Sequence, residues 1–161
     1  MKVRDLMMGN PAFCVPGMNL GSAVELFWNR NCGILPVVVD NRVKGVITDR
    51  DVCIALGTRN CLPSEITVKD VMRETVHSCG ADETIRQALQ TMAEAKVRRL
   101  PVVDVNGALE GILSMDDVII HLESRSVAGK GEIAPEDVVT TLKSIYGQKL
   151  PVPILGRTAV A

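Results

Sequence analysis

One stretch of sequence occurs twice in this chain. The first copy reads Leu35-Pro36-Val37-Val38 and then, after a turn, Gly45-Val46-Ile47-Thr48-Asp49-Arg50-Asp51. The second copy reads Leu100-Pro101-Val102-Val103 and then Gly111-Ile112-Leu113-Ser114-Met115-Asp116-Asp117. Each copy predicts two apolar strands joined by a turn, followed by a helix that begins just after Thr or Ser. Because the first amides of a helix lack partners within the helix and its dipole favours negative charge there, this junction suits an anion. An Asp one turn into the helix can accept hydrogen bonds from ribose hydroxyls.

The repetition extends outward from these copies. Val3-Arg4-Asp5-Leu6-Met7 returns as Val68-Lys69-Asp70-Val71-Met72, about 65 residues later. A doubled unit of this size lies outside the common solenoid periods and suggests two half-domains that share a core.

Each unit predicts the element order β-α-β-β-α. In the first unit a helical turn over 3–7 leads to an extended piece near 13–15 and to a helix capped by Asn19, and in the second unit Thr84-Ile85-Arg86-Gln87 is a capping-box pattern. The strands are expected over 34–39 and 43–48 in the first unit, and over 100–105 and 108–113 in the second. The final helices are expected over 49–56 and 115–122. The fold class is therefore α/β, with sheets covered by helices.

The remaining sequence gives the domain boundaries. We assign residues 1–60 to the first repeat and 65–124 to the second, with a linker, a C-terminal helix and an irregular tail over 125–161. Pro135 and the acids that follow it open the C-terminal helix, which we expect to reach Tyr146 and to stop at Gly147.

Composition excludes several classes of function. The 161 residues are 47% apolar, 23% charged and 2% aromatic, with a net charge of −1, which argues against general nucleic-acid or anionic-membrane binding. Neither a signal peptide nor an apolar run of membrane-spanning length is present. The five cysteines form no CxxC pair, which favours free thiols in the cytoplasm, with Cys14 and Cys79 in the core. His77 and His121 lack metal-ligand spacing. No nucleophile–base pair or P-loop indicates an enzyme.

The doubled pattern resembles tandem CBS-domain proteins (Bateman modules) of the stand-alone type, over Met1 to Ser124. That resemblance implies two pseudo-symmetric repeats packed as one module, with two clefts between the sheets that bind an adenosine-containing ligand such as AMP, ADP, ATP or S-adenosylmethionine. It implies a regulatory, signal-transducing role without catalysis, metal or required cofactor, with a regulated protein as a further partner. It also implies a homodimer formed through helices. Five apolar helix residues suit that surface or, equally, the core: Leu26, Phe27, Trp28, Ala93 and Val118.

The resemblance also assigns ligand-binding residues. Asp51 and Asp117 would hold ribose hydroxyls, with Thr48 and Ser114 near phosphate. Each cleft would combine one strand–helix junction with segments of the opposite repeat. Cleft A would contain Val46, Thr48, Arg50, Asp51, Thr75, Val76, Arg98, Arg99 and Pro101. Cleft B would contain Ala12, Phe13, Cys32, Gly33, Ile34, Pro36, Ile112, Ser114, Asp116 and Asp117.

The two clefts differ in charge. Arg98 and Arg99 are permanently charged fork donors that suit phosphate, whereas Gly33 and Ile34 occupy the matching positions in cleft B. We therefore expect a nucleotide phosphate chain in cleft A. In cleft B we expect weak binding, a less charged adenosine ligand, or none.

Structural interpretations of the same residues stay open. Thr48 and Asp51, like Ser114 and Asp117, also fit a helix-capping pattern. Arg98 and Arg99 could be a solvated surface pair. For the whole chain, the alternative is a ligand-free interaction module that acts through its dimer surface or its C-terminal tail.

Overall fold

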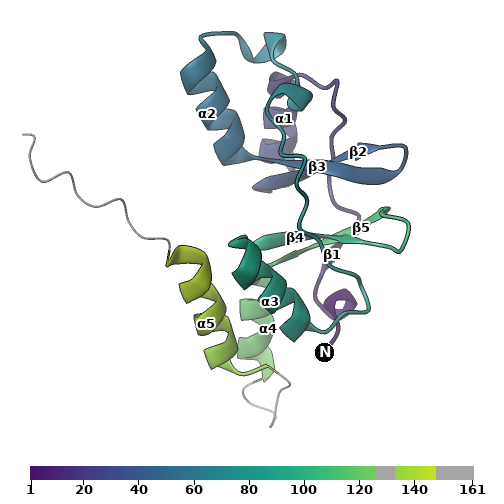
Figure 1. Cartoon of the computed structure of the whole chain (residues 1–161), viewed down its shortest axis with the longest axis vertical. Coiled ribbons are helices and arrows are strands. Elements are labelled where there is room, and N and C mark those ends of the chain that lie inside the picture. Colours follow the sequence, from purple (N-terminus) through teal and green to yellow (C-terminus); the bar gives the residue numbers. More distant parts are fainter. Residues whose placement is uncertain (126–132, 148–161) are drawn as a thin grey trace, which may run out of the picture.

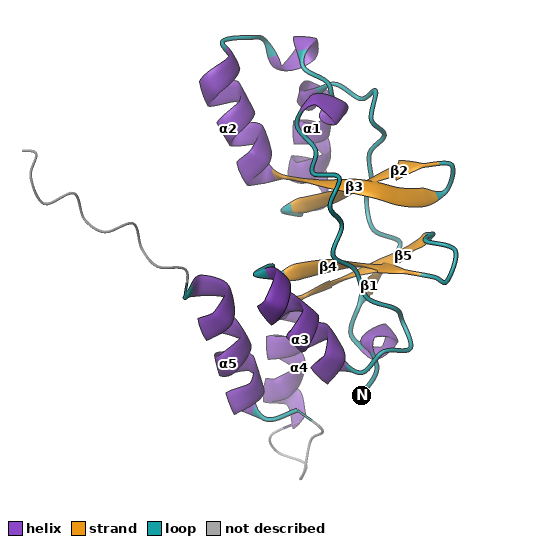
Figure 2. Ribbon diagram, in the orientation of Figure 1, coloured by secondary structure: helices purple, strands orange, loops and turns teal. Residues whose placement is uncertain are grey.

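Two antiparallel sheets face each other in the computed structural model, and helices cover the outer side of each sheet (Figures 1 and 2). The structure describes residues 1–125 and 133–147. The first half contains α1 (Leu20–Arg30), β2 (Ile34–Val39), β3 (Arg42–Thr48) and α2 (Asp49–Arg59). The second half contains α3 (Ile85–Ala95), β4 (Arg99–Val103), β5 (Leu109–Ser114) and α4 (Met115–Arg125), and α5 (Pro135–Tyr146) follows. This arrangement confirms the α/β class and the paired repeats.

The local signals in the sequence explain most element boundaries. Asn19 accepts a hydrogen bond from the Ser22 amide (2.9 Å) and so caps α1. Asp40 and Asn41 turn the first hairpin with φ values of 48° and 60°, in the left-handed region that asparagine and aspartate tolerate. The last helix of each repeat ends later than predicted, α2 at Arg59 and α4 at Arg125.

The two halves exchange their N-terminal segments. Val3 and Leu6 belong to the core of the second half, whereas Ile66 and Val68 belong to the core of the first. The two-residue strand β1 (Met8–Gly9) extends the sheet of the second half in the order β1-β5-β4. The chain then returns to the first half, where the Cys14 amide donates to the Pro36 carbonyl (2.9 Å). The predicted extended piece near 13–15 thus pairs within its own unit, through a bridge between Cys14 and Val37, whereas the crossing strand β1 was not predicted from the sequence.

Gly45 and Gly111 allow this crossing. A Cβ built on Gly111 would lie 2.9 Å from the Met8 carbonyl oxygen, and one on Gly45 would lie 2.9 Å from that of Arg73. The crossing segments approach β3 and β5 too closely for any side chain at these two positions. The glycine of the repeated motif is thus required by packing between the halves.

Helix α5 makes the halves unequal. It lies beside α3 and α4 (Figure 1) and buries Val138 and Ile145 in the second core. Arg86 fixes its first turn through a pair of hydrogen bonds to Asp137 (3.0 and 2.9 Å). No described segment covers α1 in the same way, and its Trp28 is 85% exposed. Phe27 and Val118, in contrast, are buried in the cores.

The C-terminal part of the chain follows its sequence signals as far as the structure describes it. Helix α5 ends at Tyr146, as its Gly147 stop signal predicts. The predicted irregular tail from Lys149 onward lies outside the described residues. Within 1–125 and 133–147, no helix combines the length and the apolar character needed to span a bilayer.

Candidate functional site

The junction between β3 and α2 is closed by a reciprocal cap. The Asp51 carboxylate oxygen Oδ2 accepts hydrogen bonds from the Thr48 amide (3.1 Å) and hydroxyl (2.6 Å). The Thr48 hydroxyl in turn accepts from the Asp51 amide (3.2 Å). The capping interpretation of this motif is therefore realised, but it uses only one of the two carboxylate oxygens.

The second oxygen of Asp51 is held by Arg73. Asp51 Oδ1 accepts from Arg73 Nε (3.1 Å) and Nη2 (2.7 Å), and Asp51 is only 8% exposed. Burial raises the pKa of Asp51, but hydrogen bonds from Thr48 and from Arg73, together with the Arg73 charge, outweigh it and lower the net pKa. Asp51 is thus a charged, fully engaged carboxylate in the absence of a ligand.

The junction between β5 and α4 repeats the cap without the arginine. Asp117 Oδ2 accepts from the Ser114 amide (2.8 Å) and hydroxyl (2.7 Å). Among the described residues, no lysine or arginine side chain pairs with Asp117. The residue that corresponds to Arg73 in the repeat is Met8, which is paired with Ile112 as Arg73 is paired with Val46. The second junction therefore keeps one carboxylate oxygen without a cation.

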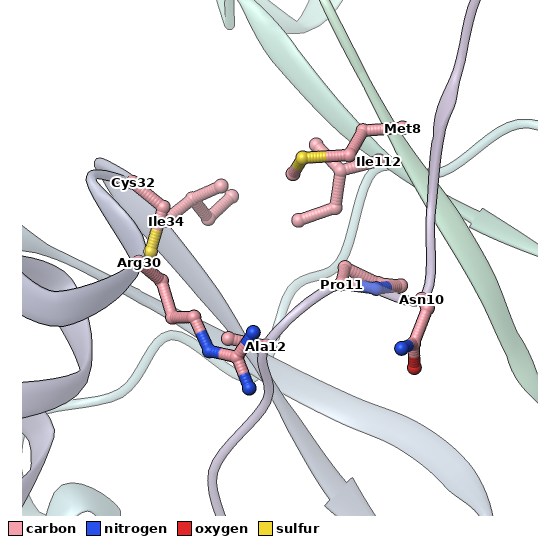
Figure 3. A pocket seen from close by; sticks show the side chains of 8 residues that line it. All are labelled: Met8, Asn10, Pro11, Ala12, Arg30, Cys32, Ile34 and Ile112. Atoms are coloured by element: carbon pink, nitrogen blue, oxygen red, sulfur yellow. The ribbon is translucent and has the colours of Figure 1, made fainter.

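A pocket of about 130 Å³ lies between the halves on the side of the second junction (Figure 3). Its walls come from the crossing segment, the end of α1, the start of β2 and one residue of β5. The lining residues are Met8, Asn10, Pro11, Ala12, Arg30, Cys32, Ile34 and Ile112. Burial raises the pKa of the Cys32 thiol above its ordinary value, so this side chain lines the pocket as a neutral group.

The pocket unites four residues assigned to cleft B: Ala12, Cys32, Ile34 and Ile112. The other cleft B residues lie around it. Pro36 is buried, Phe13 is 50% exposed, and Asp116 faces Arg99 at 3.8 Å. Four further lining residues were not predicted from the sequence, namely Met8, Asn10, Pro11 and Arg30. Of these four, only Met8 carried a positional signal in the sequence, because it follows directly after the repeated segment 3–7.

The residues assigned to cleft A are less closely grouped. Val46, Thr48 and Asp51 meet the segment that contains Arg73, and Thr75 and Val76 follow in that segment. Arg50 is exposed at the start of α2, and Pro101 is buried in β4. The structure thus brings Val46 and Asp51 to the segment that precedes Thr75 and Val76, whereas Arg98 and Arg99 take other partners.

Arg98 and Arg99 are not the arginines that pair with Asp51. Arg98 Nη1 donates to the Tyr146 hydroxyl of α5 (3.3 Å). Arg99 Nη2 lies 3.8 Å from Asp116, and a Cβ built on Gly33 would lie 3.1 Å from Arg99 Nη1. Arg99 thus contacts residues assigned to cleft B. The arginine that meets Asp51 is Arg73, which was not predicted from the sequence.

The described residues contain no group of three or more metal-ligating side chains. Burial raises the pKa values of Cys14 and Cys79 to about 12, so both thiols are neutral core groups.

Comparison with known proteins agrees with this architecture. The family model of the CBS domain matches residues 3–58 and again residues 68–124. The chain is 32% identical to the CBS domain-containing protein YhcV of Bacillus subtilis (strain 168) over 127 residues, which span 79% of this chain and 89% of that protein.

Solved structures of CBS-domain proteins share the fold. The CBS domain pair of protein MJ0100, in complex with 5′-methylthioadenosine and S-adenosyl-L-methionine, superposes with a TM-score of 0.71 at 21% identity, over 78% of this chain and 98% of that one. CBSX2 in complex with AMP superposes with a TM-score of 0.67 at 29% identity, over 78% and 98% of the two chains. With two matches to the family model, a relative above 30% identity and this shared fold, the chain belongs to the CBS-domain family.

Proposed function

We propose that this protein is a non-catalytic regulatory module that binds an adenosine-containing ligand between its two CBS repeats. The ribose of the ligand would take Asp51 or Asp117, and its adenine would lie against Val46 or Ile112. The observation that carries this proposal is the pocket on the side of Asp117, because residues of both repeats line it. A ligand in such a position bridges the repeats, and it favours whichever relative arrangement of them it binds better.

The chemistry of the pocket fits a nucleoside. Ile34, Ile112 and Met8 offer an apolar surface for a base, and Asn10 and Arg30 are polar groups at its edge (Figure 3). The complexes of MJ0100 and CBSX2 support the same ligand class, since both contain adenosine derivatives. AMP, ADP, ATP and S-adenosylmethionine are the candidates, with one or both clefts occupied.

Titration calorimetry with AMP, ADP, ATP, S-adenosylmethionine and NADH tests this function. The proposal predicts binding of at least one adenosine ligand, with loss of that binding in Asp51→Asn or in Asp117→Asn. Arg98→Ala separates the two views of Arg98, because a phosphate role predicts weaker nucleotide binding, whereas the contact with Tyr146 predicts no change in binding. If no adenosine ligand binds to protein purified free of ligand, the chain is instead a ligand-free interaction module.

The same proposal includes a cytoplasmic homodimer that acts on a further protein. The exposed apolar residues Val24, Trp28 and Ile54 lie on α1 and α2, and they are 41%, 85% and 52% exposed. In the second repeat α5 packs against α3 and α4, whereas no described helix packs in this way on α1. A second copy of the chain is the occupant that we propose for these exposed residues.

Trp28→Glu tests this surface. Because Trp28 is 85% exposed, the substitution should leave the fold intact and convert a dimer to a monomer in light scattering after size exclusion. Val105→Glu, in the turn between β4 and β5, is the matched control and should remain dimeric. A monomeric wild-type protein, or a dimeric Trp28→Glu, would rule the surface out.

A further inference from the structure

The two clefts carry different side chains at one structurally equivalent position. Arg73 and Met8 each follow the repeated N-terminal segment and pair through the backbone with the strand before the ribose-binding junction. The Arg73 amide donates to the Val46 carbonyl (2.9 Å), and the Val46 amide donates back (3.0 Å). The backbone therefore fixes both residues beside the strand that leads into their junction, whatever their side chains do.

The side chain at this position decides the state of the ribose-binding carboxylate. Arg73 donates two hydrogen bonds to Asp51 Oδ1, the oxygen that the Thr48 cap leaves open. Met8 offers no donor to Asp117 and lines the pocket instead (Figure 3). A ribose that enters cleft A must therefore displace a guanidinium from Asp51, whereas one that enters cleft B meets a carboxylate without a cation partner among the described residues.

Displacing Arg73 has a consequence that depends on the charge of the ligand. The Arg73 side chain is 64% exposed, so its guanidinium can swing away while the backbone stays on β3. A neutral nucleoside replaces an ion pair by neutral hydrogen bonds and leaves Arg73 with water alone. A nucleotide supplies an anion that the released guanidinium can hold in bidentate fashion.

We propose that Arg73 is the residue that makes cleft A selective for adenosine ligands with a 5′-phosphate, a selectivity that Met8 does not give to cleft B. The inference rests on the proposed function and names the ligand class of cleft A. It assigns to Arg73 the role that the sequence alone suggested for Arg98 and Arg99, which are paired with Tyr146 and Asp116.

AMP and adenosine are the matched probes, since they differ only in the 5′-phosphate. Calorimetry of wild-type protein, Arg73→Met and Arg73→Lys gives the ratio of the two dissociation constants for each. Arg73→Met copies the residue of cleft B and should lower the preference for AMP about tenfold or more, chiefly by weakening AMP. Adenosine should bind equally well or more tightly, because it no longer competes with Arg73. Arg73→Lys keeps the charge and should keep most of the preference.

Met8→Arg provides the converse test in cleft B. It should weaken binding of 5′-methylthioadenosine and strengthen binding of AMP. Three results would overturn the inference. Arg73→Met could change the dissociation constants of AMP and adenosine by the same factor, which would mean that Arg73 only competes with the ribose and does not select for phosphate. The substitution could leave both dissociation constants unchanged, which would mean that the ion pair between Arg73 and Asp51 has only a structural role. If none of these ligands binds to any of the proteins, the proposed function fails as well, and this outcome separates the two claims.

Discussion

Asp51 combines two roles that a single carboxylate can hold together. One oxygen closes the helix cap with Thr48, and the other is engaged by Arg73. The cap leaves the second oxygen to a different donor and lowers the pKa of the group, so the same bonds that stabilise the helix also keep this acceptor charged. Helix capping and ligand binding are thus compatible uses of the motif, and a choice between them is unnecessary.

The lowered pKa of Asp51 predicts a pH-dependent contribution to stability. A carboxyl group with a depressed pKa in the folded state stabilises the protein above its unfolded pKa of about 4 and loses that effect as the pH falls through the folded value. Asp51→Asn should cost about 1–3 kcal/mol at pH 7, because it breaks a buried, charge-assisted network. Urea unfolding of both proteins between pH 7 and the acid limit should show the two stabilities converge below pH of about 4. A difference that stays constant with pH would contradict this assignment.

The glycine of the repeated motif should be sensitive to substitution, because the crossing segment packs directly against it. Gly111→Ala places a methyl group 2.8 Å from Met7 Sδ and 2.9 Å from the Met8 carbonyl, so it should destabilise by about 1–3 kcal/mol. Gly57 is the matched control, because it lies in α2 and a Cβ placed there would meet nothing within 4 Å. Gly57→Ala should stabilise by about 0.5–1 kcal/mol through helix propensity. Similar denaturation midpoints for Gly111→Ala and wild type would show that the crossing segment packs less closely.

The starts and turns of the helices and strands could be predicted from the sequence where neighbouring residues determine them. The Asn19 and Thr84 caps, the Asp40-Asn41 turn and the Pro135 start are each set by residues within one turn of the element, and each appears where expected. The exchange of segments 3–7 and 68–72 between the halves is different in kind. Both halves offer nearly the same apolar surface to either segment, so periodicity cannot tell which half receives which segment. The structure shows which half receives each segment, because it shows where the chain crosses from one half to the other.

Helix α5 contributes to the core of the second repeat through one face only. Ile145 is 7% exposed in the core of the second repeat, so Ile145→Ala should destabilise by about 2–4 kcal/mol. Val139 lies on the same helix and is 48% exposed, so Val139→Ala should change stability by less than about 0.5 kcal/mol. Thermal unfolding of the two variants makes the comparison. Equal, small effects would mean that α5 contributes little to the fold.

In the whole molecule, the pseudo-symmetry of the two repeats produces two equivalent junctions. The junctions differ only where the two repeats carry different side chains. The repeated motif pointed to the carboxylates Asp51 and Asp117 and, through residues that belong to it or lie just before it, to Cys32, Ile34 and Ile112 of one pocket. It gave no sign of Arg73, whose contrast with Met8 appears only when the two residues are found at equivalent places. The sequence also directed Arg98 and Arg99 to phosphate, since the partners Tyr146 and Asp116 are distant from them in sequence.

A crystal structure of the protein with AMP at saturating concentration would show directly whether a nucleotide binds between the repeats. We predict electron density for the nucleotide between the two repeats, with its ribose hydroxyls within about 3 Å of Asp51 or Asp117. In the cleft of Asp51 we further predict that Arg73 has left the carboxylate for the phosphate. Ordered AMP on the surface outside both clefts, or its absence from both at saturation, would contradict the proposed function.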